Sequence, residues 1–270
     1  MKNEIVFYDN IGISCTVSDN DKPAIVLLHG NSLSSLSFKE QFSDENLKDF
    51  GLIAIDFPGH GNSGRVNNPG QNYNLFYFRD AILYVLEYFG IENFILAGHS
   101  LGGHVAMECL PFVEKCNGLV IWSAPPVKLP LNFQEIFLSN PLQGLLFKKD
   151  LSESETDQLA GILADEKHFT MLKEMIRATD PAFREALPAS LARQMVSDES
   201  KLLTESGLPV AIFHGEYDSL INYDYYQNLA IPDLWNQKAT LIRNASHSPH
   251  IEAPREFNRF LVQFISDVNY

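Results

Sequence analysis

The stretch that decides the fold is LAGHSLGGH, residues 96–104. It places Ser100 between Gly98 and Gly102, directly after an apolar run and directly before a helix-compatible run. This G-x-S-x-G pattern is typical of a sharp strand-to-helix turn that holds the serine in strained backbone geometry. A Cβ atom at either glycine would collide with the neighbouring strand or helix. The pattern therefore predicts an exposed nucleophilic hydroxyl at a helix N-terminus, where backbone N–H groups favour developing negative charge.

Outward from this turn, short apolar runs alternate with longer helical patterns. Residues 3–8 and 11–17 predict two antiparallel strands, and apolar runs without polar alternation predict strands that are buried on both faces. These runs are residues 24–28, 52–56, 94–97, 119–122, 210–213 and 239–242. Residues 78–89 and the stretch that begins at Pro254 show apolar residues at helical spacing. The alternation predicts an α/β fold with a mostly parallel central sheet flanked by helices.

One long stretch breaks this alternation. From about Val127 to Gly207 the sequence is charged and helix-like, and it predicts no buried strand. We expect residues 127–207 to form a helical cap inserted into a core of residues 1–126 and 208–270, because open α/β sheets bind ligands at the carboxyl ends of their strands. The alternative is a long helical connection without a role in binding. Its apolar side chains could line an acyl pocket or pack the cap onto the core: Phe133, Ile136, Phe137, Leu138, Leu142, Leu145, Leu146, Met171, Met175 and Ile176.

The composition narrows the possible functions. The 270 residues include 34 acidic and 20 basic side chains, a formal net charge of −14, which argues against nucleic-acid binding because phosphate contacts need clustered Lys and Arg. No run reaches the roughly 18 apolar residues of a membrane span, and the first ten residues do not resemble a signal peptide. Three cysteines form no spaced framework and predict free thiols. We expect a cytoplasmic protein, with a monomer as the default.

A serine nucleophile needs a base, and the expected base is a histidine after the last strand. Residues 244–250 read NASHSPH. His247 comes first after the strand and has small neighbours, so its ring can turn toward the nucleophile. His250 is the rival, which could instead cover the site or cap the next helix. A metal site formed by the two is disfavoured, because no nearby carboxylate or thiolate completes a ligand set, and we expect no metal or other cofactor.

The acid that orients the base should follow the preceding strand, in the sequence HGEYD. Asp218 is the expected acid. Glu216 is the rival, but it directly follows a glycine and should point away along the turn. The chain order is then Ser100, Asp218 and His247. Asp218 would fix the tautomer of His247, which would take the serine proton during attack and return it to the leaving group.

An oxyanion hole requires two backbone N–H groups. One should belong to Leu101, directly after the nucleophile, and the other should lie after the strand at 24–28. Asn31 is the expected second donor, with Ser32 as the alternative, and we expect both residues to contact substrate. The other interpretation of Asn31 is that it only shapes the turn.

The remaining loop motif, DFPGHGNS at residues 56–63, is a glycine-rich turn. It lacks the lysine and the spacing of a phosphate-binding loop, so we interpret it as structural. Asp56 and His60 are expected to hydrogen-bond backbone around the site. The other histidines are expected to be packed or loop residues: His29, His99, His104 and His214.

Together these motifs resemble those of the α/β-hydrolase superfamily. The similarity lies in residues 29–31, 56–61 and 98–103, in Asp218, and in His247 followed by the sequence EAP at 252–254. More closely, the chain is similar to the α/β-hydrolase type of N-acyl-homoserine lactonase. The matching stretches cover most of the chain: residues 29–32, 100–104, 118–127, 208–211, 234–235 and 253–257. The resemblance implies metal-independent hydrolysis of a homoserine lactone through an acyl-enzyme, which quenches a bacterial signal.

The chain departs from this family at two positions. Ser246 stands where the superfamily usually has a glycine before the base, and Asp218 stands where the lactonases carry glutamate. Both carboxylates can orient an imidazole, so the chemistry is not affected, whereas the divergent 127–207 stretch leaves the acyl specificity open.

The sequence first predicts an enzyme that hydrolyses a small-molecule ester or lactone, and three other functions stay open. The alternatives are a general carboxylesterase, a C–C bond hydrolase, and a receptor that uses the same pocket with little turnover. A haloalkane dehalogenase is disfavoured, because its chemistry needs a carboxylate nucleophile where Ser100 stands.

Overall fold

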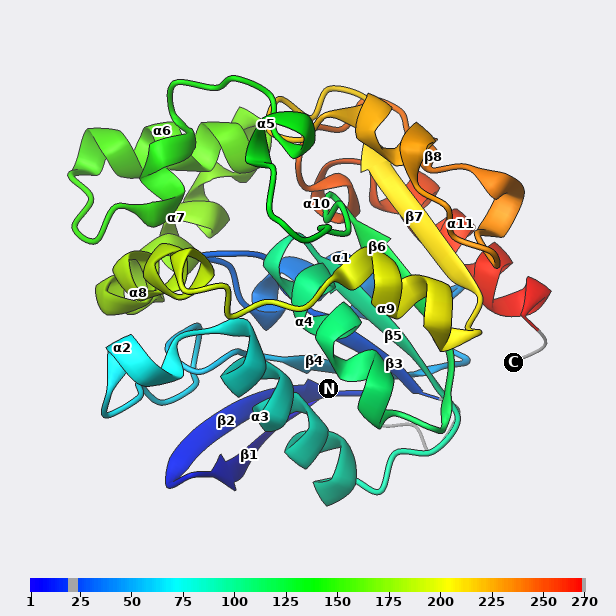
Figure 1. The fold of residues 1–270 in the computed structure, drawn as a ribbon. Coiled ribbons are helices and arrows are strands. Elements are labelled where there is room, and N and C mark those ends of the chain that lie inside the picture. Colours follow the sequence, from blue (N-terminus) through cyan, green and yellow to red (C-terminus); the bar gives the residue numbers. More distant parts are fainter. Residues whose placement is uncertain (19–23, 269–270) are drawn as a thin grey trace.

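The computed structural model describes residues 1–18 and 24–268. Within them, eight strands form one sheet in the order β1-β2-β4-β3-β5-β6-β7-β8 (Figure 1). β2 is antiparallel to both of its neighbours, and all other neighbouring strands are parallel. The strands are β1 (Lys2–Tyr8), β2 (Ile11–Val17), β3 (Ala24–Leu28), β4 (Gly51–Ile55), β5 (Phe94–His99), β6 (Cys116–Trp122), β7 (Val210–Gly215) and β8 (Thr240–Ile242).

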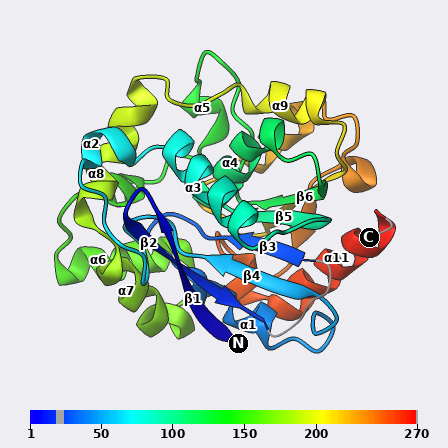
Figure 2. The same ribbon diagram turned by 90° about the horizontal axis from the view of Figure 1, so that it is seen from below.

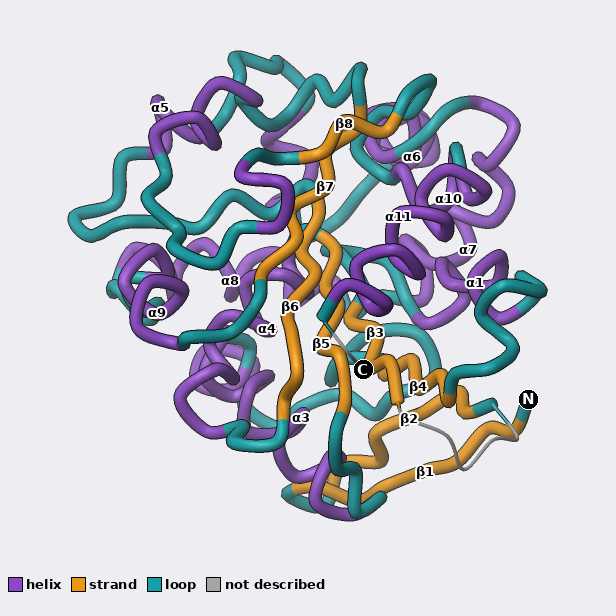
Figure 3. Tube along the Cα trace, turned by 90° about the vertical axis from the view of Figure 1, so that its right-hand side faces the viewer, coloured by secondary structure: helices purple, strands orange, loops and turns teal. Residues whose placement is uncertain are grey.

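Helices cover both faces of the sheet. Figure 3 shows α3, α4 and α9 on one side of the strands and α1, α10 and α11 on the other. The α-helices are α1 (Lys39–Phe42), α2 (Pro69–Asn72), α3 (Leu75–Tyr88), α4 (Leu101–Cys109), α5 (Phe133–Ile136), α6 (Glu153–Leu163), α7 (Phe169–Ala178), α8 (Pro181–Ala192), α9 (Glu199–Ser206), α10 (Pro249–Glu252) and α11 (Pro254–Asp267). The predicted α/β class, with a mostly parallel sheet between helices, is confirmed.

The apolar runs form strands because each supplies side chains to two cores. In β5, Leu96 joins the core shared with α3 and α4, while Ile95 and Ala97 join the core beneath α11. This alternation follows from the two-residue period of a strand. The predicted strands are all present, although β6 begins three residues earlier than the apolar run suggests. A register shift between Phe94 and Ile95 accommodates that longer strand.

Residues 127–207 connect β6 to β7, and we call them the connecting segment. They contain α5 to α9 and no strand among their described residues. Figures 1 and 2 show α6, α7 and α8 grouped at one end of the sheet. None of the described helices is long and apolar enough to cross a membrane.

Buried polar contacts fix the connecting segment to the strand-bearing part of the chain. The Tyr73 hydroxyl donates to Asp180 Oδ2 at 2.7 Å, and the Asp180 backbone N–H donates to the Gly59 carbonyl at 2.7 Å. The buried guanidinium of Arg184 donates to Ser32 Oγ at 3.4 Å and, within the connecting segment, to the Lys148 carbonyl at 3.0 Å. These bonds offset the cost of burying their polar groups.

Candidate active site

Ser100 lies at the sharp turn between β5 and α4. Its φ of 48° and ψ of −114° are unusual for a non-glycine residue, and it occupies the N-cap position of α4. A Cβ at Gly98 would overlap the Gly102 carbonyl, and a Cβ at Gly102 would overlap the Leu28 carbonyl of β3. The two glycines therefore let helix and strands approach closely enough to force this turn.

Ser100, His247 and Asp218 come together at the carboxyl ends of β5, β7 and β8. His247 Nε2 lies 3.2 Å from Ser100 Oγ, and His247 Nδ1 lies 2.9 Å from Asp218 Oδ2. Both distances are those of hydrogen bonds. This geometry allows the Ser100 hydroxyl to pass its proton to Nε2 of His247. The opposite ring nitrogen, Nδ1, is held by the Asp218 carboxylate.

The Asp218 side chain is fully buried. Burial opposes its ionisation, but His247 and the backbone N–H of Leu220 outweigh this effect and lower the pKa of Asp218. Its Oδ1 atom accepts the N–H groups of Leu220 at 2.9 Å and Ile221 at 3.2 Å. The carboxylate is thus ionised and aimed at the imidazole. Glu216, the rival acid, instead accepts the Asn244 backbone N–H at 3.0 Å, away from the ring.

Two further histidines support the loop that carries His247. His99 Nε2 lies 2.8 Å from the His247 carbonyl, and the Trp122 indole N–H donates to His250 Nδ1 at 3.0 Å. Burial lowers the pKa of both His99 and His250 well below the ordinary value, so both rings are neutral at pH 7. Since a carbonyl only accepts, the proton of His99 sits on Nε2. His250 is a packing residue and neither covers the site nor caps α10.

The two residues expected to supply the oxyanion hole, Leu101 and Asn31, line the same pocket as Ser100. Leu28, at the end of β3, pairs with Gly98 of β5, so the loop that follows β3 begins beside Ser100. Among the described residues, the backbone N–H groups of Leu101 and Asn31 donate to no protein atom. Two such groups beside one hydroxyl can bind the oxygen of a tetrahedral intermediate.

The side chains of Asn31 and Ser32 differ in their surroundings. Asn31 lines the pocket, and its Nδ2 donates to the Leu146 carbonyl of the connecting segment at 3.2 Å. Ser32 is fully buried, adopts a positive φ of 58°, and donates its hydroxyl to Asn31 Oδ1 at 2.8 Å. The structure therefore brings Asn31 to the site but places the Ser32 side chain behind it, where it contacts Asn31 rather than the pocket.

In the glycine-rich turn after β4, Asp56 and His60 contact backbone groups, as expected from the sequence. Asp56 Oδ1 accepts the Ser35 backbone N–H at 2.6 Å, and its Oδ2 accepts that of Asn62 at 2.9 Å. The His60 ring lies 3.2 Å from the Pro58 carbonyl through Nδ1. This turn positions the loops around the site without reaching the nucleophile.

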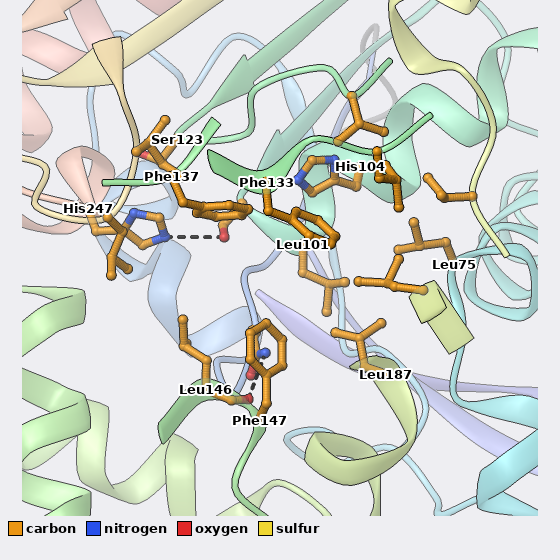
Figure 4. A pocket seen from close by; sticks show the side chains of 18 residues that line it. Leu75, Leu101, His104, Ser123, Phe133, Phe137, Leu146, Phe147, Leu187 and His247 are labelled. Carbon is orange, nitrogen blue, oxygen red and sulfur yellow. Dashed lines mark hydrogen bonds between the residues drawn. The ribbon is translucent and has the colours of Figure 1, made fainter. Parts of the chain in front are cut away.

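A pocket opens over Ser100 and His247, and its walls are almost entirely apolar (Figure 4). The connecting segment supplies much of the wall, through Phe133, Phe137, Leu146, Phe147, Leu187 and Leu191. Of the apolar residues singled out from its sequence, Phe133, Phe137 and Leu146 face the pocket. Others, such as Met175 and Ile176, are buried in the core.

Sequence reasoning missed two polar residues of this pocket. Ser123, at the end of β6, has a φ of 49° and a buried hydroxyl without a hydrogen-bond partner among the described residues. His104 was expected to be a packed or loop histidine, yet it lines the pocket one turn of α4 beyond Ser100. Its spacing of four residues from the nucleophile was the available signal, because residues at i and i+4 share a helix face.

The fold and this site define a hydrolase of the α/β type, and comparison with known proteins agrees. Residues 25–260 match the Alpha/beta hydrolase family, and the chain belongs to that family. Its curated relatives include the bifunctional esterase/perhydrolase of Acinetobacter calcoaceticus, 23% identical over 96% of this chain and 95% of that protein. The AB hydrolase superfamily protein YisY of Bacillus subtilis is 24% identical over 89% and 90% of the two chains.

Two solved structures are more similar still. N-acyl homoserine lactonase AidH, as a mutant in complex with N-hexanoyl homoserine lactone, superposes with a TM-score of 0.95 at 27% identity. That alignment covers 99% of this chain and 98% of AidH. AidH in complex with N-butanoyl homoserine superposes with a TM-score of 0.94 at 28% identity, over 99% and 97% of the two chains.

Proposed function

We propose that this protein hydrolyses carboxylic esters and lactones through Ser100, His247 and Asp218, and that its substrate is an N-acyl-homoserine lactone. The observation that carries the proposal is the hydrogen-bonded series from Ser100 Oγ through His247 to Asp218, beneath an apolar pocket. The similarity to AidH over 99% of the chain supports the choice of lactone. An apolar pocket suits an acyl chain, because burying CH₂ groups is favourable at about 0.8 kcal/mol each.

The proposed reaction has two halves. His247 Nε2 takes the Ser100 proton as Oγ attacks the lactone carbonyl carbon, and the backbone N–H groups of Leu101 and Asn31 bind the resulting oxyanion. When the intermediate collapses, the ring C–O bond breaks and His247 protonates the released alkoxide. Water, deprotonated by His247, then attacks the acyl-enzyme, and the open N-acyl-homoserine leaves while Ser100 regains its proton.

We further propose that the connecting segment acts as the cap of this site. Residues from α5, α8 and the 3-10 helix η3 (Gln143–Phe147) line the pocket, and Asn31 holds the Leu146 carbonyl. A wall built from helices over the strand ends excludes water from the acyl-enzyme and selects the acyl chain. Replacing pocket leucines by larger side chains should therefore alter chain-length preference more than it alters the rate on the shortest substrates.

The test is ring opening of N-butanoyl-, N-hexanoyl- and N-octanoyl-homoserine lactone, followed by proton release, with p-nitrophenyl butyrate in parallel. We expect lactone opening that survives EDTA and disappears in Ser100→Ala. Because the variant lacks only the nucleophile, it should still bind lactone. Activity that persists in Ser100→Ala would contradict the mechanism.

A general carboxylesterase is the second candidate, and the similarity to the Acinetobacter calcoaceticus esterase/perhydrolase favours it. Turnover of p-nitrophenyl butyrate without lactone opening would select this alternative. The same triad would then act on an acyclic ester, whose alcohol departs instead of remaining attached.

A further inference from the structure

His104 is the one charged or ionisable side chain, besides the proposed base, among the described residues that line the pocket. It projects from α4, and its backbone N–H donates to the Ser100 carbonyl at 3.2 Å. Side chains one turn apart on a helix have Cβ atoms about 5–6 Å apart. A chain whose carbonyl carbon is bound at Ser100 therefore meets His104 several bonds further along.

The imidazole of His104 is held by a buried carboxylate. Its Nδ1 lies 2.9 Å from Glu199 Oε2 and 3.0 Å from Oε1, and the Glu199 side chain is fully buried whereas 19% of the His104 side chain is exposed. Glu199 also accepts the Val127 backbone N–H at 2.9 Å. Since a carboxylate only accepts, Nδ1 carries a proton.

The remaining ring nitrogen, Nε2, makes no hydrogen bond to another described residue, and the His104 side chain lines the pocket and is partly exposed. Burial by itself lowers the pKa of His104, but the charge and hydrogen bond of Glu199 outweigh it and raise that pKa. Burial also raises the pKa of Glu199, which opposes ionisation of that carboxyl. When the pair is ionised, the His104 ring carries a second N–H on Nε2. The pocket thus combines aliphatic and aromatic walls with one charge-assisted donor placed partway along it.

We propose that His104 is a specificity-determining residue, whose Nε2–H binds a ketone or hydroxyl oxygen carried partway along the acyl chain. This inference rests on the proposed function, because it assumes that the substrate carbonyl binds at Ser100. A lactone attacked at its ring carbonyl has its N-acyl chain attached at the adjacent carbon, so an oxygen on that chain lies several bonds beyond Ser100, in the pocket that His104 also lines. Beyond its amide carbonyl an unsubstituted chain has only CH₂ groups, which would leave an Nε2–H facing them without a partner, and this is costly in an apolar pocket.

The competing explanation is purely structural, because Glu199 and Val127 lie near the two ends of the connecting segment and His104 helps to hold them. Two substitutions separate these roles. In His104→Asn the amide can occupy the position of Nδ1, so it keeps a donor for Glu199 but presents nothing at Nε2. In His104→Gln the amide nitrogen reaches the Nε2 position and gives up the short contact with Glu199.

The experiment measures binding in the Ser100→Ala background, so that it does not depend on turnover. Calorimetric Kd values are compared for N-hexanoyl-homoserine lactone and its 3-oxo and 5-oxo analogues, with His104 intact, His104→Asn and His104→Gln. With His104 intact, we expect about tenfold tighter binding of one oxo analogue, the size of a charge-assisted hydrogen bond. The preference should persist in His104→Gln and disappear in His104→Asn, while melting temperatures should fall more in His104→Gln.

Equal Kd values for all three ligands with His104 intact, or no binding of any of them, would overturn the inference. So would a preference that survives in His104→Asn and is lost in His104→Gln. The proposed function is judged separately, from lactone opening by the protein with Ser100 intact. A protein that binds oxo chains preferentially but opens no lactone would contradict the hydrolase proposal and support the role of His104.

Discussion

At the residue scale, substitutions can test whether the carboxylate of Asp218 orients His247 or whether Asp218 only fills its buried position. Asp218→Asn keeps the shape but allows the wrong tautomer of His247, and the lost orientation should reduce kcat on the order of 10³–10⁴-fold. Asp218→Glu should retain measurable activity, because a longer carboxylate can still accept from Nδ1. Steady-state kinetics on the best substrate, with melting temperature as the folding control, tests both. A small loss in Asp218→Asn would show that another carboxylate orients the base.

The three residues of the proposed triad could be brought together from sequence because each lies in a short loop or turn directly after a recognisable strand. Local motifs specify such positions: Ser100 by its glycines, Asp218 and His247 by their place after β7 and β8. His104 and Ser123 escaped prediction for the opposite reason. His104 lies inside α4 and Ser123 directly follows β6. The four-residue spacing of His104 from Ser100 indicates a shared helix face, but only tertiary packing decides that either side chain faces a pocket instead of a core.

At the scale of elements, the turn between β5 and α4 depends on glycine. Gly98→Ala would place a methyl group against the Gly102 carbonyl, so strand and helix must separate. We expect a loss of several kcal/mol, comparable with overpacking of a core, together with loss of activity, measured by urea unfolding and hydrolysis. Gly70→Ala is the matched control, because no atom lies within 4 Å of its Cβ position and it sits in helix α2. Equal effects of the two changes would contradict this account.

A second prediction at this scale concerns Glu252 at the end of α10. Its carboxylate accepts the Ser246 backbone N–H at 2.8 Å and the Asp165 N–H of the connecting segment at 2.9 Å. Glu252→Ala should cost roughly 0.5–1.5 kcal/mol of stability for each hydrogen bond lost, and it should lower kcat by loosening the loop of His247. The control is Glu256→Ala, which removes the carboxylate that accepts the Arg243 backbone N–H. This bond does not involve Ser246, so kcat should change little. Equal kcat values in the two variants would contradict the proposal that Glu252 holds the loop of His247 in place.

The role of Glu252 also explains a departure seen in the sequence. Ser246 replaces the glycine that usually precedes the base, and its hydroxyl lies 2.8 Å and 2.9 Å from the two Glu252 oxygens. The substitution adds a hydrogen bond to the same carboxylate. Sequence alone identifies the departure, but the partner lies six residues away and was not predictable from the local pattern.

At the scale of the whole molecule, the fold was predictable from sequence because alternating strand and helix patterns allow few arrangements. The residues that line the pocket were not predictable in this way. Leu187 and Leu191 lie on α8 at helical spacing, a pattern that indicates an apolar face without saying what that face meets. The connecting segment is positioned by contacts far apart in sequence, such as that between Tyr73 and Asp180. The pocket is therefore a property of the assembled molecule.

The assembled core also gives stability a defined pH dependence. Burial lowers the pKa values of His60, His99 and His250 well below the ordinary 6.5. Below pH 6.5 the unfolded chain therefore binds more protons than the folded one, and the stability that these neutral rings allow at pH 7 is lost as the pH falls. Three such groups should lower the free energy of unfolding by about 3–4 kcal/mol between pH 7 and pH 5.5.

His250→Gln isolates one part of this effect. The variant has one histidine fewer to protonate on unfolding, so between pH 7 and pH 5.5 it should lose about 1 kcal/mol less stability than the wild type. Its absolute stability at pH 7 should be lower, because the Trp122 indole N–H loses the Nδ1 acceptor. Urea unfolding of both proteins across this pH range gives the two curves. Parallel curves would mean that His250 binds a proton equally well folded and unfolded, contrary to its sealed position between Trp122 and Phe257.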